Sequence, residues 1–67
     1  MTVALKQDIT FGDTTLTKDS KGIVVGVSNS NAVKTSATHV SPKVNDWAYI
    51  VKFPQLECLL DISQISF

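Results

Sequence analysis

The stretch that decides the fold is WAYIVKF, residues 47–53. Large side chains occupy every second position of it: Trp47, Tyr49, Val51 and Phe53. This is the period of an extended strand with one buried face. Pro54 follows at once, and proline ends a strand because it has no N–H to donate to the sheet. Residues 47–53 are therefore predicted to form a strand that stops before Pro54.

A second alternating stretch begins directly after this proline. Its apolar side chains again occupy every second position: Leu56, Cys58, Leu60 and Ile62. Because only Pro54 and Gln55 separate the two stretches, we expect a tight antiparallel hairpin. Leu59 interrupts the otherwise polar opposite face. Residues 63–66 are predicted to form a short 3₁₀ turn near the end of the chain.

The N-terminal half is also rich in strand signals. One parity of residues 3–11 is apolar: Val3, Leu5, Ile9 and Phe11. This pattern predicts one half-buried strand, and Gly12 and Asp13 indicate the turn that ends it. Residues 14–20 are polar apart from Leu16, which favours a loop with one apolar anchor.

Residues 21–27, KGIVVGV, predict a further strand. Plain alternation places Ile23, Val25 and Val27 on one of its faces. Gly22 and Gly26 interrupt the other face, and glycine inside a strand often marks a bulge or a close approach of another group. We therefore expect this strand to bend sharply.

Residues 29–46 allow two interpretations. Their residues are small and alternate weakly, which fits either a short edge strand or a long loop. We expect a loop over residues 32–40. A connection of this length without structure is often functional in a compact domain.

Size and composition favour binding over catalysis. The chain has 67 residues, of which 43% are apolar and 18% charged, so we expect one folded domain, 1–67. Six lysines balance six acidic residues, and arginine is absent. This charge balance argues against strong binding to nucleic acid or to a membrane surface. Zero net charge also makes self-association easy, because copies repel one another little.

The single cysteine, Cys58, excludes an intrachain disulfide and fits a reducing compartment. No apolar run reaches the roughly 20 residues of a membrane helix. The first residues lack the basic and apolar regions of a signal peptide. We therefore expect a cytoplasmic protein with no membrane segment.

The order of these elements resembles a small SH3-like barrel. Residues 21–25, KGIVV, are similar to the K-G-x-V-V strand of KOW-type domains. Residues 47–53 resemble the Y-x-V-x-F strand of many small barrels, and residues 59–65 match the place of a strand and a 3₁₀ turn. Proteins of similar layout include the variable chain of ferredoxin–thioredoxin reductase and NifZ-type accessory proteins. The resemblance implies an all-β barrel of about five antiparallel strands, with a non-catalytic accessory or regulatory role.

Few residues carry recognisable chemistry. His39 has no neighbour at metal-ligand spacing and is expected to be a solvated loop residue. Cys58 alternates in phase with leucines and is expected to be a buried small hydrophobe. The aspartates show no calcium-loop spacing, and the glycines form no phosphate-binding motif. We predict no catalytic residue, no metal site and no cofactor.

The candidate partner-binding residues are Trp47, Tyr49, Ile50 and Leu59. We expect Val51 and Phe53 to lie in the core, whereas Trp47 and Tyr49 fit either the core or an exposed stacking platform. Ile50 and Leu59 fall on faces predicted to be exposed. They would form an apolar patch across neighbouring strands, and such patches usually mark interfaces.

The leading hypothesis is a non-catalytic protein–protein interaction module that binds another protein or a second copy of itself. One alternative is a nucleic-acid-associated KOW-like or OB-like module. It would use Trp47 and Tyr49 together with the lysines at positions 18, 21, 34, 43 and 52. Another alternative is an inhibitor of a host complex carried by a phage or mobile element. Enzyme activity is not expected, because no nucleophile–base pair or metal cluster is visible.

Overall fold

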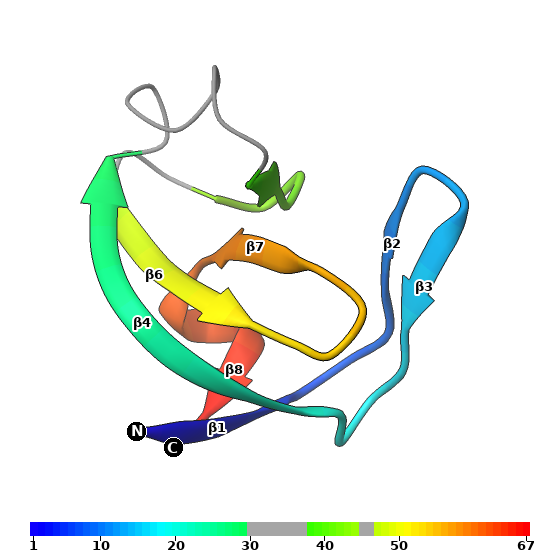
Figure 1. Ribbon diagram of the computed structural model, residues 1–67, viewed down its shortest axis with the longest axis horizontal. Coiled ribbons are helices and arrows are strands. Elements are labelled where there is room, and N and C mark those ends of the chain that lie inside the picture. Colours follow the sequence, from blue (N-terminus) through cyan, green and yellow to red (C-terminus); the bar gives the residue numbers. More distant parts are fainter. Residues whose placement is uncertain (30–37, 45–46) are drawn as a thin grey trace.

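The computed structural model describes residues 1–29, 38–44 and 47–67, and these residues form an all-β fold with one 3₁₀ turn (Figure 1). The strands are β1 (Thr2–Leu5), β2 (Ile9–Phe11), β3 (Thr14–Leu16), β4 (Lys21–Asn29), β5 (His39–Val40), β6 (Trp47–Lys52), β7 (Glu57–Leu60) and β8 (Ile65–Ser66). The 3₁₀ turn, η1, spans Ile62–Gln64. The all-β prediction is therefore confirmed.

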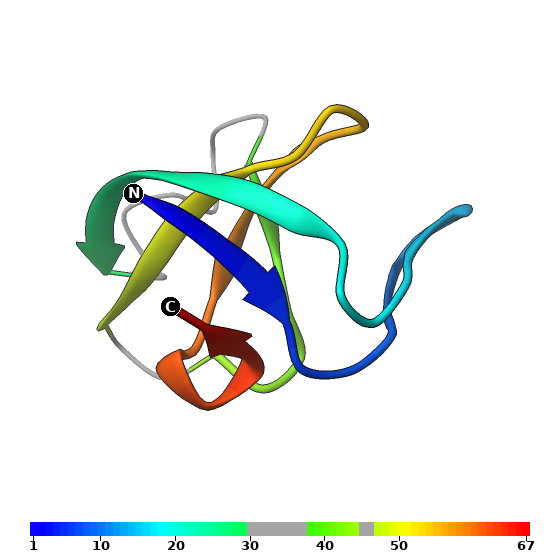
Figure 2. The same ribbon diagram turned by 90° about the horizontal axis from the view of Figure 1, so that it is seen from below.

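The main sheet has the strand order β5-β7-β6-β4-β1-β8. Its longest strand, β4, pairs with β1 along its first residues and with β6 along most of its length. This strand curves around the side of the molecule, so that one sheet wraps around the core (Figures 1 and 2). The strands at the two ends of this order, β5 and β8, are not paired with each other. The sheet is therefore strongly bent but is not a closed barrel.

The predicted hairpin is present as β6 and β7, but β7 ends at Leu60. The prediction that Ile62 belongs to the apolar face of this strand is wrong, because Ile62 lies in η1 and is exposed. Its turn is closed by a hydrogen bond of 2.8 Å from the N–H of Phe53 to the carbonyl of Leu56. Tyr49 lies opposite Leu60, and Val51 lies opposite Cys58. Directly opposed residues project from the same face of a sheet. This inner face meets the core, whose buried members are Val3, Leu5, Ile9, Phe11, Leu16, Val51, Phe53, Cys58, Leu60 and Ile65.

The strand β4 contains a bulge that changes which residues share a face. The register with β6 shifts between Val24 and Gly26, which leaves Val25 as the extra residue. Before the bulge, Ile23 lies opposite Lys52, on the outer face; after it, Val27 lies opposite Tyr49, on the inner face. The prediction that Ile23, Val25 and Val27 share one face is therefore wrong. One inserted residue reverses the alternation.

The N-terminal region differs from its predicted outline. Residues 3–11 form two strands, β1 and β2, because the chain turns at residues 6–8. Residues 14–16 form strand β3 instead of a loop, and this strand pairs with β2 across a turn at Gly12, whose φ is 58°. The apolar anchor Leu16 is fully buried, as expected. The β2–β3 hairpin projects beside the main sheet (Figure 1).

A parallel strand pair was not expected. Within residues 29–46, His39 and Val40 form β5 and pair with Cys58 and Leu59 of β7 in parallel. The expected loop over residues 32–40 is therefore wrong at its end, whereas residues 32–37 lie outside the described residues. With eight strands in the described residues, and with this parallel pair, the fold also departs from the expected count of about five antiparallel strands.

The 3₁₀ turn is hydrogen-bonded to Ser41, the residue that follows β5. Asp61 caps the turn by accepting from the N–H of Ser63, and the side chain of Gln64 accepts from the N–H of Asp61 at 2.8 Å. The other end of the same amide, Nε2 of Gln64, donates to Oγ of the buried Ser41 at 2.6 Å. The turn predicted over residues 63–66 is thus present at Ile62–Gln64, whereas Ile65 and Ser66 form strand β8.

Candidate functional site

Exposed aromatic and apolar side chains gather where β4 ends and β6 begins. Trp47 and Tyr49 lie on the same inner face of β6, and Val27 lies opposite Tyr49 on β4. The ring of Phe67 meets the Tyr49 ring edge-on, with centroids 5.4 Å apart. Trp47 is 67% exposed, Val27 60% and Phe67 59%. We call Val27, Trp47, Tyr49 and Phe67 the aromatic end.

The aromatic end lies on the same face of the sheet as the core, but outside its buried part. Further along β6, Val51 on this face is fully buried. Tyr49 stands between the two environments, since it packs against the core and also contacts Phe67. Of the two interpretations open for these aromatics, the exposure of Trp47 fits a surface platform, whereas Tyr49 is partly buried against the core. Val51 and Phe53 lie in the core, as predicted.

Ile50 and Leu59 lie side by side, as predicted, but they do not form a surface patch. They are directly opposed on β6 and β7. Leu59 is fully buried, because it belongs with Ala48 to a second apolar cluster that is covered by Val40 and Val44. The prediction that Leu59 is exposed is therefore wrong.

The four candidate residues therefore lie on two faces of the sheet. Trp47 and Tyr49 share the inner face of β6, whereas Ile50 of β6 and Leu59 of β7 share the outer face, where Val40 and Val44 pack against the Leu59 cluster. Alternation could not reveal these contacts, since Val40 and Val44 lie 19 and 15 residues before Leu59 in the sequence. Sequence reasoning also missed Val27, whose face depends on the bulge, and Phe67, whose ring contact depends on how β8 lies.

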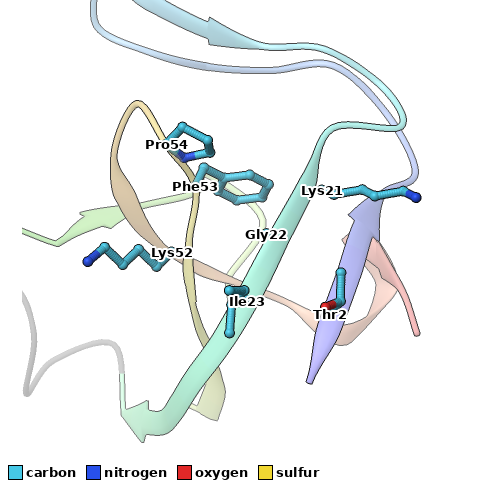
Figure 3. Close-up of a pocket in the computed structure, with 7 residues that line it drawn as sticks. All are labelled: Thr2, Lys21, Gly22, Ile23, Lys52, Phe53 and Pro54. Carbon is cyan, nitrogen blue, oxygen red and sulfur yellow. The ribbon is translucent and has the colours of Figure 1, made fainter.

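A groove of about 470 Å³ lies on the outer face of the sheet. It is located near Ile23, the residue of β4 that pairs with both β1 and β6. Ile23, Phe53 and Pro54 supply its apolar surface (Figure 3). Lys21 and Lys52 flank it, and their side chains extend away from each other (Figure 3). Lys52 also lies opposite Glu57 on β7. The lining residues include two amines and the Thr2 hydroxyl.

The shape of this groove depends on Gly22. A Cβ atom built on Gly22 would lie 2.6 Å from Cγ1 of Val51 and 2.9 Å from a ring carbon of Phe53. The phenyl ring can therefore pack against β4 only because Gly22 has no side chain. The expectation of a close approach at this glycine is confirmed.

The Cys58 thiol is buried in β7, and its register partner on β5 is His39. Burial, with a smaller effect from the charge of Glu57, raises the pKa of the Cys58 thiol from 9.0 to about 12. A thiol with so high a pKa is inert at neutral pH. His39 is exposed, as expected, but lies in β5, and its ring meets Phe11 edge-on at 5.7 Å. Across the described ranges, no three His, Cys, Asp or Glu side chains are grouped as metal ligands.

No family model, curated protein or solved structure matches this chain. The described residues also contain no helix with the length and hydropathy needed to cross a bilayer.

Proposed function

We propose that this chain is a non-catalytic protein–protein interaction module that binds its partner through the aromatic end. The observation that carries the proposal is the grouping of Val27, Trp47 and Phe67, all more than half exposed, around the Tyr49 ring. Contiguous exposed apolar surface is typical of interaction sites, and tryptophan and tyrosine are enriched among the residues that dominate binding energy. The underlying sheet holds Trp47 and Tyr49 in place, which lowers the entropy lost on binding.

We further propose that the sheet is an SH3-like barrel left open between β5 and β8. In this proposal the chain is a small accessory or regulatory subunit. Three features support the assignment. The strands run β8-β1-β4-β6-β7 side by side, one long bent strand joins the two halves of the sheet, and a 3₁₀ turn precedes the last strand. The buried thiol of Cys58 supports a reducing compartment such as the cytoplasm.

The arrangement of charge gives less support to nucleic-acid binding. Trp47 and Lys52 lie at opposite ends of β6, and a strand rises about 3.3 Å per residue, so their backbones are roughly 16 Å apart. Lys21 lies at the Lys52 end, in the groove. A single-strand binding site instead interleaves stacking aromatics with basic residues along one track.

The test is capture of a partner from the native host with tagged protein. We expect the partner to be retained by the parent chain and lost by both Trp47→Ser and Phe67→Ser. The matched control is Ile62→Ser, because Ile62 is 59% exposed but lies in the 3₁₀ turn. Circular dichroism must show all variants folded. A partner retained by both aromatic variants would contradict the proposal, and salt-dependent binding to a single-stranded oligonucleotide would favour the nucleic-acid alternative.

A further inference from the structure

Two lysines and an exposed isoleucine are neighbours on the outer face of the sheet, at the groove. Lys21 and Ile23 are two positions apart on β4, before the bulge, so they project from the same face. Ile23 lies opposite Lys52 of β6. Lys21 and Lys52 are therefore diagonal neighbours, and the Cα atoms of such neighbours lie about 7–8 Å apart in an antiparallel pair. Ile23 lies between the two lysine side chains (Figure 3).

The positive charge of these lysines is not neutralised within the part of the chain that the structure describes. Neither ammonium group forms an ion pair with a described residue. Glu57 lies opposite Lys52 on β7, but its Oε2 accepts a hydrogen bond of 2.9 Å from Oγ1 of Thr38. Thr38 directly precedes β5, and β5 and β6 lie on opposite sides of β7, so this bond directs the carboxylate away from Lys52. The groove is therefore locally positive, although the chain has a formal net charge of zero.

The surface between the two lysines is apolar and is formed by the fold itself. Ile23 is 54% exposed, and Pro54 is exposed beside it in the turn that the bond from Phe53 to Leu56 closes. The ring of Phe53 packs against Gly22, where a Cβ atom would lie 2.9 Å from it. Because this surface belongs to paired strands and a closed turn, little conformational entropy is lost when a partner covers it.

We propose that the groove binds a segment of another protein in which apolar residues lie between acidic ones. The apolar side chains of the segment cover Ile23 and Pro54, and its carboxylates meet Lys21 and Lys52. Charge complementarity identifies this occupant, because cations on both sides of an apolar surface favour anions on both sides of an apolar group. An extended segment rises about 3.3 Å per residue, so acidic residues three positions apart lie about 10 Å apart, within reach of two diverging lysines.

Two other occupants fit the groove less well. A single nucleic-acid strand binds by stacking its bases on exposed aromatic rings. Among the described residues that line the groove, the aromatic ring is that of Phe53, which is buried. Small-molecule pockets enclose most of their ligand, whereas this groove lies on the outer face of a sheet, beside an isoleucine with more than half of its surface exposed. A protein segment can instead extend along the face and beyond the groove.

The groove is separate from the aromatic end, and this inference does not rest on the proposed function. Lys52 lies at one end of β6 and Trp47 at the other. Trp47→Ser and Phe67→Ser are therefore expected to leave binding at the groove unchanged. Loss of the captured partner and loss of binding at the groove are separate results.

The test is binding of a labelled synthetic peptide in which Leu-Phe has two glutamates on each side. Fluorescence anisotropy at low salt, where exposed charges are least screened, measures its affinity. Lys21→Gln and Lys52→Gln are each expected to weaken binding about two- to fivefold, the range for an exposed ion pair, and the double variant should bind more weakly than either. Ile23→Ser should also weaken binding several-fold, because it removes apolar contact.

Matched controls are available for both kinds of substitution. Lys43→Gln removes the same charge from an exposed lysine that follows β5, and Ile62→Ser changes an isoleucine that is 59% exposed in the 3₁₀ turn. Both are expected to bind the peptide as the parent chain does. All of these residues are exposed, so the variants are expected to fold, and circular dichroism checks that they do.

Two altered peptides separate charge from apolar contact. Replacing the glutamates by glutamine, or Leu-Phe by Gly-Ser, is expected to weaken binding to the parent chain several-fold. Amide chemical-shift changes caused by the original peptide should be concentrated at residues 21–23 and 52–53. The proposal is overturned if the original peptide shows no saturable binding at millimolar concentration, if Lys43→Gln weakens binding as much as Lys52→Gln does, or if the three peptides bind equally. Tighter binding of a single-stranded oligonucleotide that depends on Lys21 and Lys52 assigns the groove to nucleic acid and equally overturns it.

Discussion

The packing around Gly22 makes a quantitative prediction about stability. In Gly22→Ala the new methyl group would lie 2.6 Å from Cγ1 of Val51 and 2.9 Å from the Phe53 ring. Val51 is fully buried and Phe53 is nearly so, which leaves neither side chain space to withdraw. Overpacking of this kind typically costs about 1–3 kcal/mol. A chain of this length has a free energy of unfolding of roughly 3–10 kcal/mol, so the variant is expected to lose a large part of it.

Gly26→Ala is the matched control, because it makes the same chemical change four residues along the same strand. A Cβ on Gly26 would meet only Cδ1 of Ile50, at 3.8 Å, which is ordinary contact. Its backbone φ is not positive. We therefore expect no loss of stability, or a gain of about 0.4–1 kcal/mol from the lower entropy of the unfolded chain.

Urea unfolding followed by tryptophan fluorescence measures both variants against the parent chain. For a domain of this size, each kcal/mol also shifts the Tm by roughly 4–8 °C. Val51→Ala in the Gly22→Ala background removes the closest clashing atom, so the double variant should be more stable than the sum of the single effects predicts, by about 0.5–3 kcal/mol. Equal midpoints for Gly22→Ala and Gly26→Ala would refute the packing argument.

Three further predictions concern buried and capping groups. The free energy of unfolding should fall between about pH 9 and pH 12, because the unfolded chain loses the Cys58 proton in this range. The folded chain retains this proton, since its thiol has a pKa of about 12. Cys58→Ala should remove this part of the pH dependence in urea titrations. Ser41→Ala leaves Nε2 of the buried Gln64 without its acceptor and should cost about 1–3 kcal/mol, as measured by thermal unfolding. Asp61→Ala removes the cap of the 3₁₀ turn and should cost about 0.5–2 kcal/mol, whereas Asp61→Asn should retain most of the stability.

The period-two pattern predicted the hairpin and most of the core because both depend on local alternation. Val51, Phe53, Cys58 and Leu60 are buried where the pattern places them. Pro54 marks the end of β6 because its missing N–H acts within one residue of its position. Both the alternation and the position of the proline can be read from the residues of the strands themselves.

The errors arose where the environment of a residue depends on distant segments. The residues two positions before and after Leu59, Glu57 and Asp61, are acidic, yet Val40 and Val44 pack against the Leu59 cluster. A strand with one solvated face alternates between apolar and polar residues, whereas a strand covered on both faces is apolar throughout. One leucine at an otherwise polar set of positions does not distinguish these two cases. Strand β3 was missed for a related reason, since three residues are stable as a strand only when paired with β2.

The bulge at Val25 links the fold to the aromatic end. Without the extra residue, strict alternation would place Gly26 instead of Val27 opposite Tyr49, and no apolar side chain of β4 would extend the aromatic end. Exposure alone would not single out this surface, because Ile62 is as exposed as Phe67. The aromatic end differs from Ile62 in having apolar neighbours on the same face, and Val27 joins that face because of one inserted residue.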